Sequence, residues 1–286
     1  MTIIHHHILV VIFIFICHFA TVSSWVSQYT NTNRHQQIDV TAMSSTRSDD
    51  DDDGSIGGSL LVSNMHKIGL IDDTSSKLRL LLASQSPRRR EILDMIGLAG
   101  RYTAEPSPLN EEELQIELAQ KQYTPHDYAR TLAERKAHAM SVTMSPSNGE
   151  VTLIIGSDTI VDLDGHIMNK PTSEKDAFNM LSRLSGNWHQ VHTGVAVYAV
   201  GLDDDEKLMF SFTDSASVQF AALTEHDIKS YVASKEPMDK AGGYGIQGIG
   251  GQLVQRLEGD YFTVMGLPMH RLSREMSKAI NSLGII

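Results

Sequence analysis

The sequence predicts an α/β protein from about residue 76 onward, and two patterns support this fold class. Apolar runs typical of strands, such as Leu78–Ala83 and Val151–Ile155, alternate with segments whose apolar residues recur at helical spacing. Several of the helical segments begin with a Ser or Thr cap that is followed three residues later by Asp. The chain of 286 residues is 41% hydrophobic and 21% charged, as expected of a globular protein with one or two domains. Functional residues are therefore expected in loops that follow strands, where α/β proteins bind their ligands.

Residues 1–75 do not share these patterns. The apolar run over residues 8–19 is too short to span a bilayer, and it resembles the core of a signal peptide although no Lys or Arg precedes it. Residues 27–63 are polar and include five consecutive aspartates, a composition typical of a disordered linker. We expect a leader over residues 1–75 and a globular domain over residues 76–286. A leader favours a secretory or organelle location, and the alternative is an extension upstream of the true start.

Charge and cysteine content exclude several function classes for the globular domain. Of the 24 basic and 35 acidic residues, 3 and 8 fall in residues 1–75, which leaves 21 basic and 27 acidic residues. A mildly acidic domain offers no basic field for duplex nucleic acid. Cys17, the sole cysteine, lies in the leader, so the domain has no disulfide, thiolate nucleophile or cysteine-ligated zinc. Nor do we expect a stable membrane span in it.

The first strand runs into a loop and a helix that are unusually rich in arginine. Ser86 is a suitable helix cap and Pro87 suits the first helical position. Arg88, Arg89 and Arg90 then fall in the first turn, where the helix dipole is already positive. This placement favours a bound anion, held by free backbone N–H groups and bidentate arginine forks. The alternative is three solvated surface arginines.

The next predicted helix begins at Thr124, after a polar and acidic segment over residues 101–122 that includes Glu111. Pro125 occupies the first helical position, and Thr124 with Asp127 forms a capping-box pattern. Lys136 lies on the apolar face of this helix. The commoner explanation is a stem that packs on the apolar surface while its ammonium group reaches water. The alternative is a cation that projects into a cleft.

A carboxylate follows the strand at Val151–Ile155. The strand runs into Gly156–Thr159, which we interpret as a break before the strand resumes, and the chain then turns at Asp164–Gly165. Asp158 lies within the break. A carboxylate just past a buried strand commonly faces a cleft in an α/β protein. The alternative is that Asp158 only forms a turn.

The remaining elements follow from caps, β-rich runs and glycines. Helices are predicted after Ser173, Thr224 and Gly266, and strands over residues 188–200, 208–212, 215–222, 252–257 and 260–264. Residues 236–251 are rich in glycine and include the pattern G-x-G-x-x-G. We reject a dinucleotide site, because a strand and not a helix follows. So many glycines instead imply a backbone that approaches something closely or bends sharply.

The candidate residues point to phosphate chemistry. Cations at strand–loop boundaries suit a polyphosphate, and carboxylates beside them suit Mg²⁺, which prefers oxygen ligands. The cations are Arg88, Arg89, Lys136, Lys170 and Lys240, and the acids are Asp158 and Glu111. Asp158 could act as a base or as a metal ligand. The residues themselves therefore predict a phosphate-handling α/β enzyme.

Several motifs also resemble the Maf family of nucleoside triphosphate pyrophosphatases, from about residue 78 to the end. The motifs are ASQSPRR at 83–89, GSDT at 156–159, KP at 170–171, LSG at 184–186, HQVHTG at 189–194 and GLP at 266–268. The resemblance implies a two-lobed, inosine-triphosphatase-like fold with a central mixed sheet flanked by helices and an active-site cleft. It also implies a cytoplasmic homodimer that hydrolyses nucleoside triphosphates to the monophosphate and pyrophosphate with Mg²⁺ or Mn²⁺.

Residues 240–248, KAGGYGIQG, resemble the branch of this family that acts on dTTP and UTP. The resemblance implies that Arg88, Thr159 and Gln247 select the base and that Asp158 is catalytic. The remaining implied substrate-binding residues are Ser84, Arg89, Lys136, Lys170 and Lys240. Glu111 is implied as a metal ligand beside Asp158, although Asn110 stands where the family more often has Asp. Alternatives are a 7-methyl-GTP pyrophosphatase, a non-catalytic nucleotide-binding regulator of cell division and, less favoured, a nucleotidyltransferase.

Overall fold

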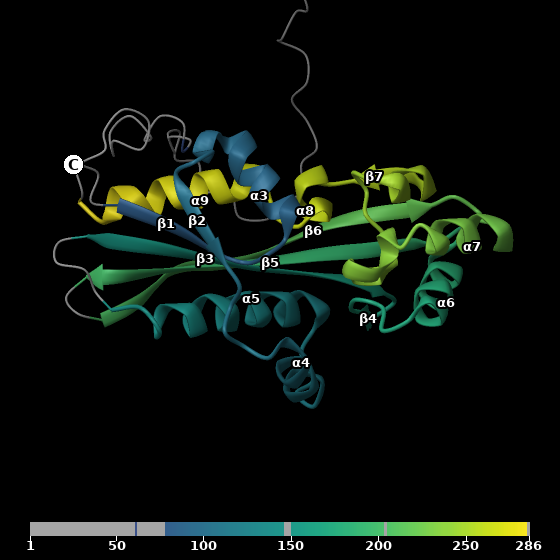
Figure 1. The fold of residues 1–286 in the computed structure, drawn as a ribbon, viewed down its shortest axis with the longest axis horizontal. Coiled ribbons are helices and arrows are strands. Elements are labelled where there is room, and N and C mark those ends of the chain that lie inside the picture. The colour runs from purple at the N-terminus through teal and green to yellow at the C-terminus, as the bar shows by residue number, and fades with distance from the viewer. Residues whose placement is uncertain (1–60, 62–77, 146–149, 203–204, 285–286) are drawn as a thin grey trace, which may run out of the picture. The chain divides into compact units, whose positions relative to one another are not determined.

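A mixed seven-stranded sheet forms the centre of the protein (Figure 1). The computed structural model describes residue 61 and residues 78–145, 150–202 and 205–284. The sheet order is β2-β1-β3-β5-β6-β7, with β4 also paired to β3; β1 is parallel to β2 and β3, and the other pairs are antiparallel. The strands are β1 (Leu78–Ala83), β2 (Tyr102–Glu105), β3 (Val151–Leu163), β4 (His166–Met168), β5 (Trp188–Leu202), β6 (Asp205–Phe220) and β7 (Val254–Glu258).

Helices cover both faces of this sheet. In Figure 1, α3 and α9 lie on one face and α5 on the other. The α-helices are α3 (Pro87–Leu93), α4 (Glu111–Ala119), α5 (Pro125–Ser141), α6 (Glu174–Leu184), α7 (Glu225–Ala233), α8 (Tyr261–Met265) and α9 (Met269–Ser282). A π-helical turn over Asp94–Leu98 extends α3, and short 3-10 turns lie at Glu236–Asp239, Ala241–Gly243 and Ile249–Leu253.

Alternation along the strands divides the apolar side chains between two sides of the sheet. Leu80 and Leu82 of β1 pack in a cluster with residues of α3 and α9, whereas Leu81 packs in a cluster with Ala133 and Ala137 of α5. This is the period of two expected for a strand that is covered on both faces. Each fully buried large aliphatic side chain contributes roughly 1.5–3 kcal/mol relative to an exposed one.

A further core lies where α6 and α7 pack against the sheet. Residues from α6, α7, β3, β4, β5 and β6 share this cluster, in which the rings of Phe220 and Tyr244 pack edge to face. The long strands β3, β5 and β6 therefore run through both halves of the fold. The predicted two-lobed α/β architecture, with a mixed sheet flanked by helices, is confirmed.

Four sequence predictions about elements were wrong or incomplete. Gly156–Thr159 is no break, because β5 pairs with β3 continuously from Thr152 to Asp162. The two strands predicted over residues 208–222 are the single strand β6, which pairs along β5. Residues 260–264 form no strand, since Asp260 accepts the Phe262 N–H and caps α8. The polar segment 101–122 contains β2 and α4, whose first turn is capped by Asn110.

The expected leader lies almost entirely outside the described residues. The boundary near residue 75 stays a prediction. Leu61, which is described, is buried in the core beside α3 and α9, with 1% of its surface exposed. Within the described part of the chain, no helix is long and apolar enough to cross a membrane.

Candidate active site

The candidate site lies beside β3, at a stretch where one side of this strand has no hydrogen-bonded neighbouring strand among those described. On one side, β5 pairs with β3 throughout. On the other side, β1 pairs with β3 only up to Ile155, and β4 begins to pair at Val161. Among the described strands, none pairs with this side of β3 between these two residues. The sequence predicted a break in the strand, but the interruption lies between its neighbours β1 and β4. Asp158 and Thr159 are adjacent in β3 and point to opposite faces of the sheet, yet both line the cavity at this gap.

Two glycines bring α5 unusually close to the sheet beside this gap. A Cβ atom on Gly156 would lie 2.5 Å from the Ala133 carbonyl oxygen, and one on Gly194 would lie 2.1 Å from that of Ala129. Gly194 is the cross-strand partner of Asp158. Only glycine permits this approach of helix to sheet. It places Lys136 of α5 directly against Asp158.

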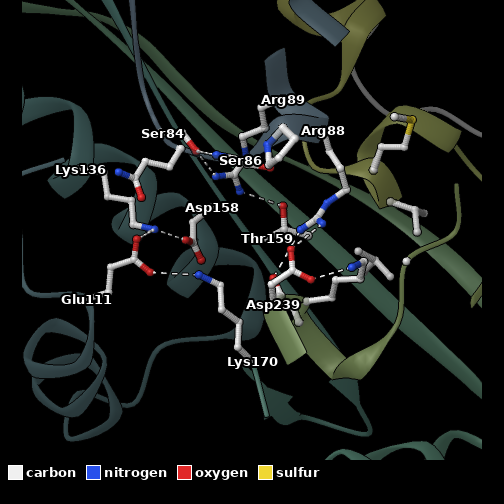
Figure 2. A pocket seen from close by; sticks show the side chains of 18 of the residues that line it. Ser84, Ser86, Arg88, Arg89, Glu111, Lys136, Asp158, Thr159, Lys170 and Asp239 are labelled. Carbon is white, nitrogen blue, oxygen red and sulfur yellow. Dashed lines mark hydrogen bonds and ion pairs between the residues drawn. The ribbon is translucent and has the colours of Figure 1, made fainter. Parts of the chain in front are cut away.

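Lys136 joins two carboxylates inside the site, as Figure 2 shows. Its Nζ atom donates to Asp158 Oδ1 at 2.5 Å and lies 2.9 Å from Glu111 Oε1. Glu111 Oε2 lies 3.5 Å from Lys170 Nζ. The Lys136 side chain is 5% exposed, so its ammonium points into the site and not to bulk water. The explanation that the Lys136 stem carries its ammonium group to water is wrong, and the alternative of a cation in a cleft is confirmed.

Opposite charges control protonation in this cluster. Burial works against ionisation of Glu111, but Lys136, Lys170 and Arg89 outweigh it and hold the pKa of Glu111 at about 2. Burial likewise lowers the pKa of Lys136, yet Asp158 and Glu111 raise it above its usual value overall. Glu111 is therefore ionised and Lys136 protonated at neutral pH.

Arg89 organises the opposite wall of the site. Its guanidinium donates to Ser84 Oγ at 3.0 Å, to Thr159 Oγ1 at 3.3 Å and to the Gly266 carbonyl at 2.9 Å. Thr193 Oγ1 lies 2.9 Å from Thr159 Oγ1 and donates its own proton to the Thr263 carbonyl. Thr159 must therefore donate to Thr193 and accept from Arg89. Because the Arg89 guanidinium bonds to both Ser84 and Thr159, it fixes the loop after β1 against β3.

Arg88 and Lys240 share a carboxylate that the sequence analysis did not select. Asp239 Oδ2 lies 3.1 Å from Arg88 NH1, and Asp239 Oδ1 lies 2.6 Å from Lys240 Nζ. Asp239 precedes Lys240 in the chain, and that adjacency is the signal that could have identified it. Arg90, by contrast, is exposed and does not line the site. The structure thus separates Arg89, beside Thr159, from Arg88, beside Asp239.

Gln247 lies in the glycine-rich segment and contributes to the same wall of the site. Its Oε1 atom is buried and has no hydrogen-bond partner among the residues that the structure describes. A buried amide oxygen without a donor costs about 1–3 kcal/mol. Because Gln247 also lines the cavity, a hydrogen-bond donor supplied by a ligand would remove this cost.

These residues line one cavity of about 290 Å³. Every site residue predicted from the sequence lies along it: Ser84, Arg88, Arg89, Glu111, Lys136, Asp158, Thr159, Lys170, Lys240 and Gln247. Its lining has five basic side chains against three carboxylates, those of Glu111, Asp158 and Asp239. The excess of two positive charges suits an anionic ligand.

The donor set is compatible with a hard divalent cation. Asp158 and Glu111 both contact one Lys136 Nζ atom, so oxygens of the two carboxylates lie close together. No group of three or more His, Cys, Asp or Glu side chains that could hold a metal occurs in the described ranges. Mg²⁺ commonly takes only one or two carboxylates and fills its other positions with water and substrate phosphates. These two acids fit that mode of binding.

Fold and site together define an α/β protein whose cleft is built for a phosphorylated, anionic ligand. Comparison with known proteins agrees: residues 79–279 match the family described as Maf-like protein. The chain belongs to this family.

Named relatives are similar over the same region. The chain is 40% identical over 200 residues to a dTTP/UTP pyrophosphatase of Bacillus cereus, covering 70% of this chain and 95% of that protein. It is also 40% identical over 203 residues to a human protein named probable bifunctional dTTP/UTP pyrophosphatase/methyltransferase protein, covering 70% of this chain and 32% of the human protein. Among solved structures, the Ham1 protein of Staphylococcus aureus aligns with a TM-score of 0.33 and 13% identity, covering 72% of this chain and 98% of that one.

Proposed function

We propose that this protein is a nucleoside triphosphate pyrophosphatase that hydrolyses dTTP and UTP to the monophosphate and pyrophosphate. The observation that carries this proposal is the cavity at the open edge of β3, where five cations and three carboxylates meet. Cations neutralise the phosphates and the leaving pyrophosphate, and a carboxylate activates water. The relatives named dTTP/UTP pyrophosphatase support the choice of substrate.

Arg88, Lys170 and Lys240 are the cations proposed to contact phosphate oxygens. Arg88 and Lys240 currently hold Asp239, whose carboxylate stands where a phosphate oxygen would be bound. Ser84 Oγ accepts bonds from Arg89 and from the Ser86 N–H, so its own proton can be donated to the ligand. Arg89, fixed by three acceptors, adds charge to the cavity and shapes its wall.

Asp158 is the proposed catalytic carboxylate. Water would form a bond to phosphorus while the bond to the pyrophosphate oxygen breaks, and the proton from water would pass to Asp158. Lys136 engages Asp158 Oδ1, so Oδ2 is the oxygen that would accept this proton. Ligation of a metal is the second role open to Asp158.

We further propose that Mg²⁺ or Mn²⁺ serves as cofactor, held by Asp158 and Glu111. Bound there, the ion would neutralise charge on the phosphates. This assignment is supported by the two carboxylates, which both contact Lys136 and lie beside the other basic side chains of the cavity. Activity that is lost in a chelator and restored by either cation would support this assignment. Full activity in the chelator would contradict it.

Gln247 is the proposed base-reading residue. Uracil and thymine present an N3–H donor between two carbonyl acceptors, which complements the donor and acceptor of one planar amide. The acceptor Oε1 is the buried atom without a partner in the described structure. Cytosine, with an unprotonated N3, would leave this oxygen unsatisfied. Gln247→Glu should therefore strongly lower turnover of dTTP and UTP while it changes the melting temperature little. Unchanged relative rates for UTP and CTP, with only a lower melting temperature, would make Gln247 a structural residue.

One experiment separates the proposed function from its competitors. Purified protein is mixed in turn with dTTP, UTP, CTP, ATP and 7-methyl-GTP, with and without Mg²⁺, and turnover is measured. We expect fastest turnover of dTTP and UTP. Preference for 7-methyl-GTP would indicate the other branch of the family. Tight binding of any of these without turnover would indicate a regulator.

The resemblance that indicated the family also implies a homodimer, and we propose this assembly for the full chain. Light scattering on purified protein is expected to give twice the mass of one chain. A mass of one chain across the working concentration range would contradict the dimer.

A further inference from the structure

The carboxylate of Glu236, which does not line the cavity, accepts hydrogen bonds from the backbone of the glycine-rich loop that carries Gln247. Glu236 Oε2 accepts the Ile249 N–H at 2.9 Å, and Oε1 accepts the Gly250 N–H at 3.0 Å. Burial raises the pKa of Glu236, but these backbone bonds and the neighbouring donors lower it overall. Glu236 is therefore an ionised acceptor that binds one end of the loop.

Tyr231 of α7 binds the other end. Its hydroxyl donates to Glu236 Oε1 at 3.0 Å and accepts the Gly245 N–H at 3.3 Å. The loop is thus attached before and after Gln247, by two side chains that bond to each other. Neither Glu236 nor Tyr231 lines the cavity.

This attachment explains glycines that the sequence analysis left without a role. A Cβ on Gly248 would lie 2.6 Å from Glu236 Oε1, and one on Gly250 would lie 2.4 Å from the Tyr231 hydroxyl. The backbone must therefore approach these two side chains closely, and only glycine allows it. The close approach is made to the protein's own carboxylate and phenol.

Lys240 connects the segment that carries Glu236 to the basic side chains that line the cavity. Its Nζ atom donates to the backbone carbonyl of Glu236 at 2.7 Å and contacts Asp239. The segment that places Glu236 behind the loop thus also places Lys240 along the cavity. Movement of the loop backbone at Gln247 away from the cavity is opposed by hydrogen bonds to the backbone on both sides of it.

We propose that Glu236 and Tyr231 are positioning residues that set base selectivity by fixing the loop around Gln247. This inference rests on the proposed function, because it concerns selectivity among triphosphates. Under that function, Gln247 in this loop contacts the base and not the reacting phosphate. Loss of the attachment should therefore raise KM for the preferred base more than it changes kcat.

The test measures kcat and KM for UTP and CTP in wild-type protein, Glu236→Gln and Tyr231→Phe. The glutamine keeps the shape of the side chain but loses one acceptor and the charge, so one backbone N–H of the loop loses its partner. We expect the ratio of kcat/KM for UTP to that for CTP to fall at least tenfold, mainly through KM. Tyr231→Phe should act in the same direction and serves alone if Glu236→Gln does not fold.

Asp227→Asn is the matched control. Asp227 lies on α7, as Tyr231 does, and accepts from Thr224 in the capping box of that helix. This variant should lower the melting temperature and leave the UTP to CTP ratio unchanged. A wild-type ratio in both folded test variants, or an equal loss in Asp227→Asn, would overturn the inference. Wild-type protein that turns over neither UTP nor dTTP would overturn the proposed function as well.

Discussion

Lys136 Nζ lies 2.5 Å from Asp158 Oδ1, in a position that α5 reaches only because Gly156 and Gly194 carry no Cβ. The pair joins a helix and a strand that lie on different layers of the fold. It sits where β3 has lost its neighbour on one side, so the carboxylate is both buried by the protein and open to a ligand. The chemistry proposed above depends on this placement.

Replacing the carboxylate should abolish activity and leave the fold intact. Asp158→Asn keeps an oxygen for Lys136 but loses basicity and charge, so we expect kcat to fall by about 10²–10⁴. Asp164→Asn is a suitable control, because Asp164 adopts φ 54° in the β3–β4 turn, a conformation that asparagine also tolerates. Turnover of Asp158→Asn within a few-fold of wild type would remove Asp158 from the mechanism.

The two arginines after Pro87 should respond differently to lysine. Arg88 pairs with the exposed Asp239, so Arg88→Lys should raise KM for dTTP, through loss of the planar fork, with little change in melting temperature. Arg89 spans Ser84, Thr159 and Gly266, which one ammonium group cannot do. Arg89→Lys should therefore lower the melting temperature as well. Equal melting temperatures for both variants would contradict this distinction.

His189 should make stability depend on pH. Burial, opposed in part by a backbone hydrogen bond, lowers its pKa to about 4, below its ordinary value of 6.5. Between these values the unfolded chain binds a proton that the folded chain does not, so the free energy of unfolding falls as pH falls through this window. The loss should total about 3 kcal/mol, since each pKa unit is worth about 1.4 kcal/mol.

Denaturant unfolding from pH 7.5 to pH 4 measures this effect. The side chain bonds to the Tyr244 hydroxyl, so His189→Gln is the variant of choice. It should be less stable at pH 7.5 but show a shallower loss toward pH 4. Parallel curves for the two proteins would show that another group controls the acid sensitivity.

The close packing of α5 predicts a large cost for one methyl group. Gly194→Ala would place a Cβ 2.1 Å from a backbone oxygen, and we expect a loss of about 3 kcal/mol in the free energy of unfolding. Gly100→Ala tests strain without a clash, because Gly100 has φ +71° and nothing lies within 4 Å of its Cβ position. That control should lose about 1–2 kcal/mol. Similar losses in the two variants would mean that α5 moves to accept the methyl group.

Local signals predicted the elements that local physics determines. Thr124, Ser173 and Thr224 each accept the backbone N–H that a cap should accept, and the helices start where predicted. Asp260 shows the limit, because its segment is apolar enough for a strand, yet its carboxylate caps a short helix that Gly266 ends at φ 118°.

The site was predicted as a set of residues but not as an arrangement. The gap beside Asp158 depends on where β1 ends and β4 begins, and neither boundary is written near residue 158. The direction of Lys136 depends on α5 lying against Gly156 and Gly194, a contact between segments far apart in the chain. Asp239 was missed because its role appears only once Arg88 reaches it from the first turn of α3.

The products formed from UTP and Mg²⁺ test the central claim most directly. If the cavity beside Asp158 hydrolyses the bond between the α and β phosphates, chromatography should detect UMP and pyrophosphate in equal amounts, formed at least about a hundredfold more slowly by Asp158→Asn. UDP with inorganic phosphate, or wild-type yields from Asp158→Asn, would contradict the account.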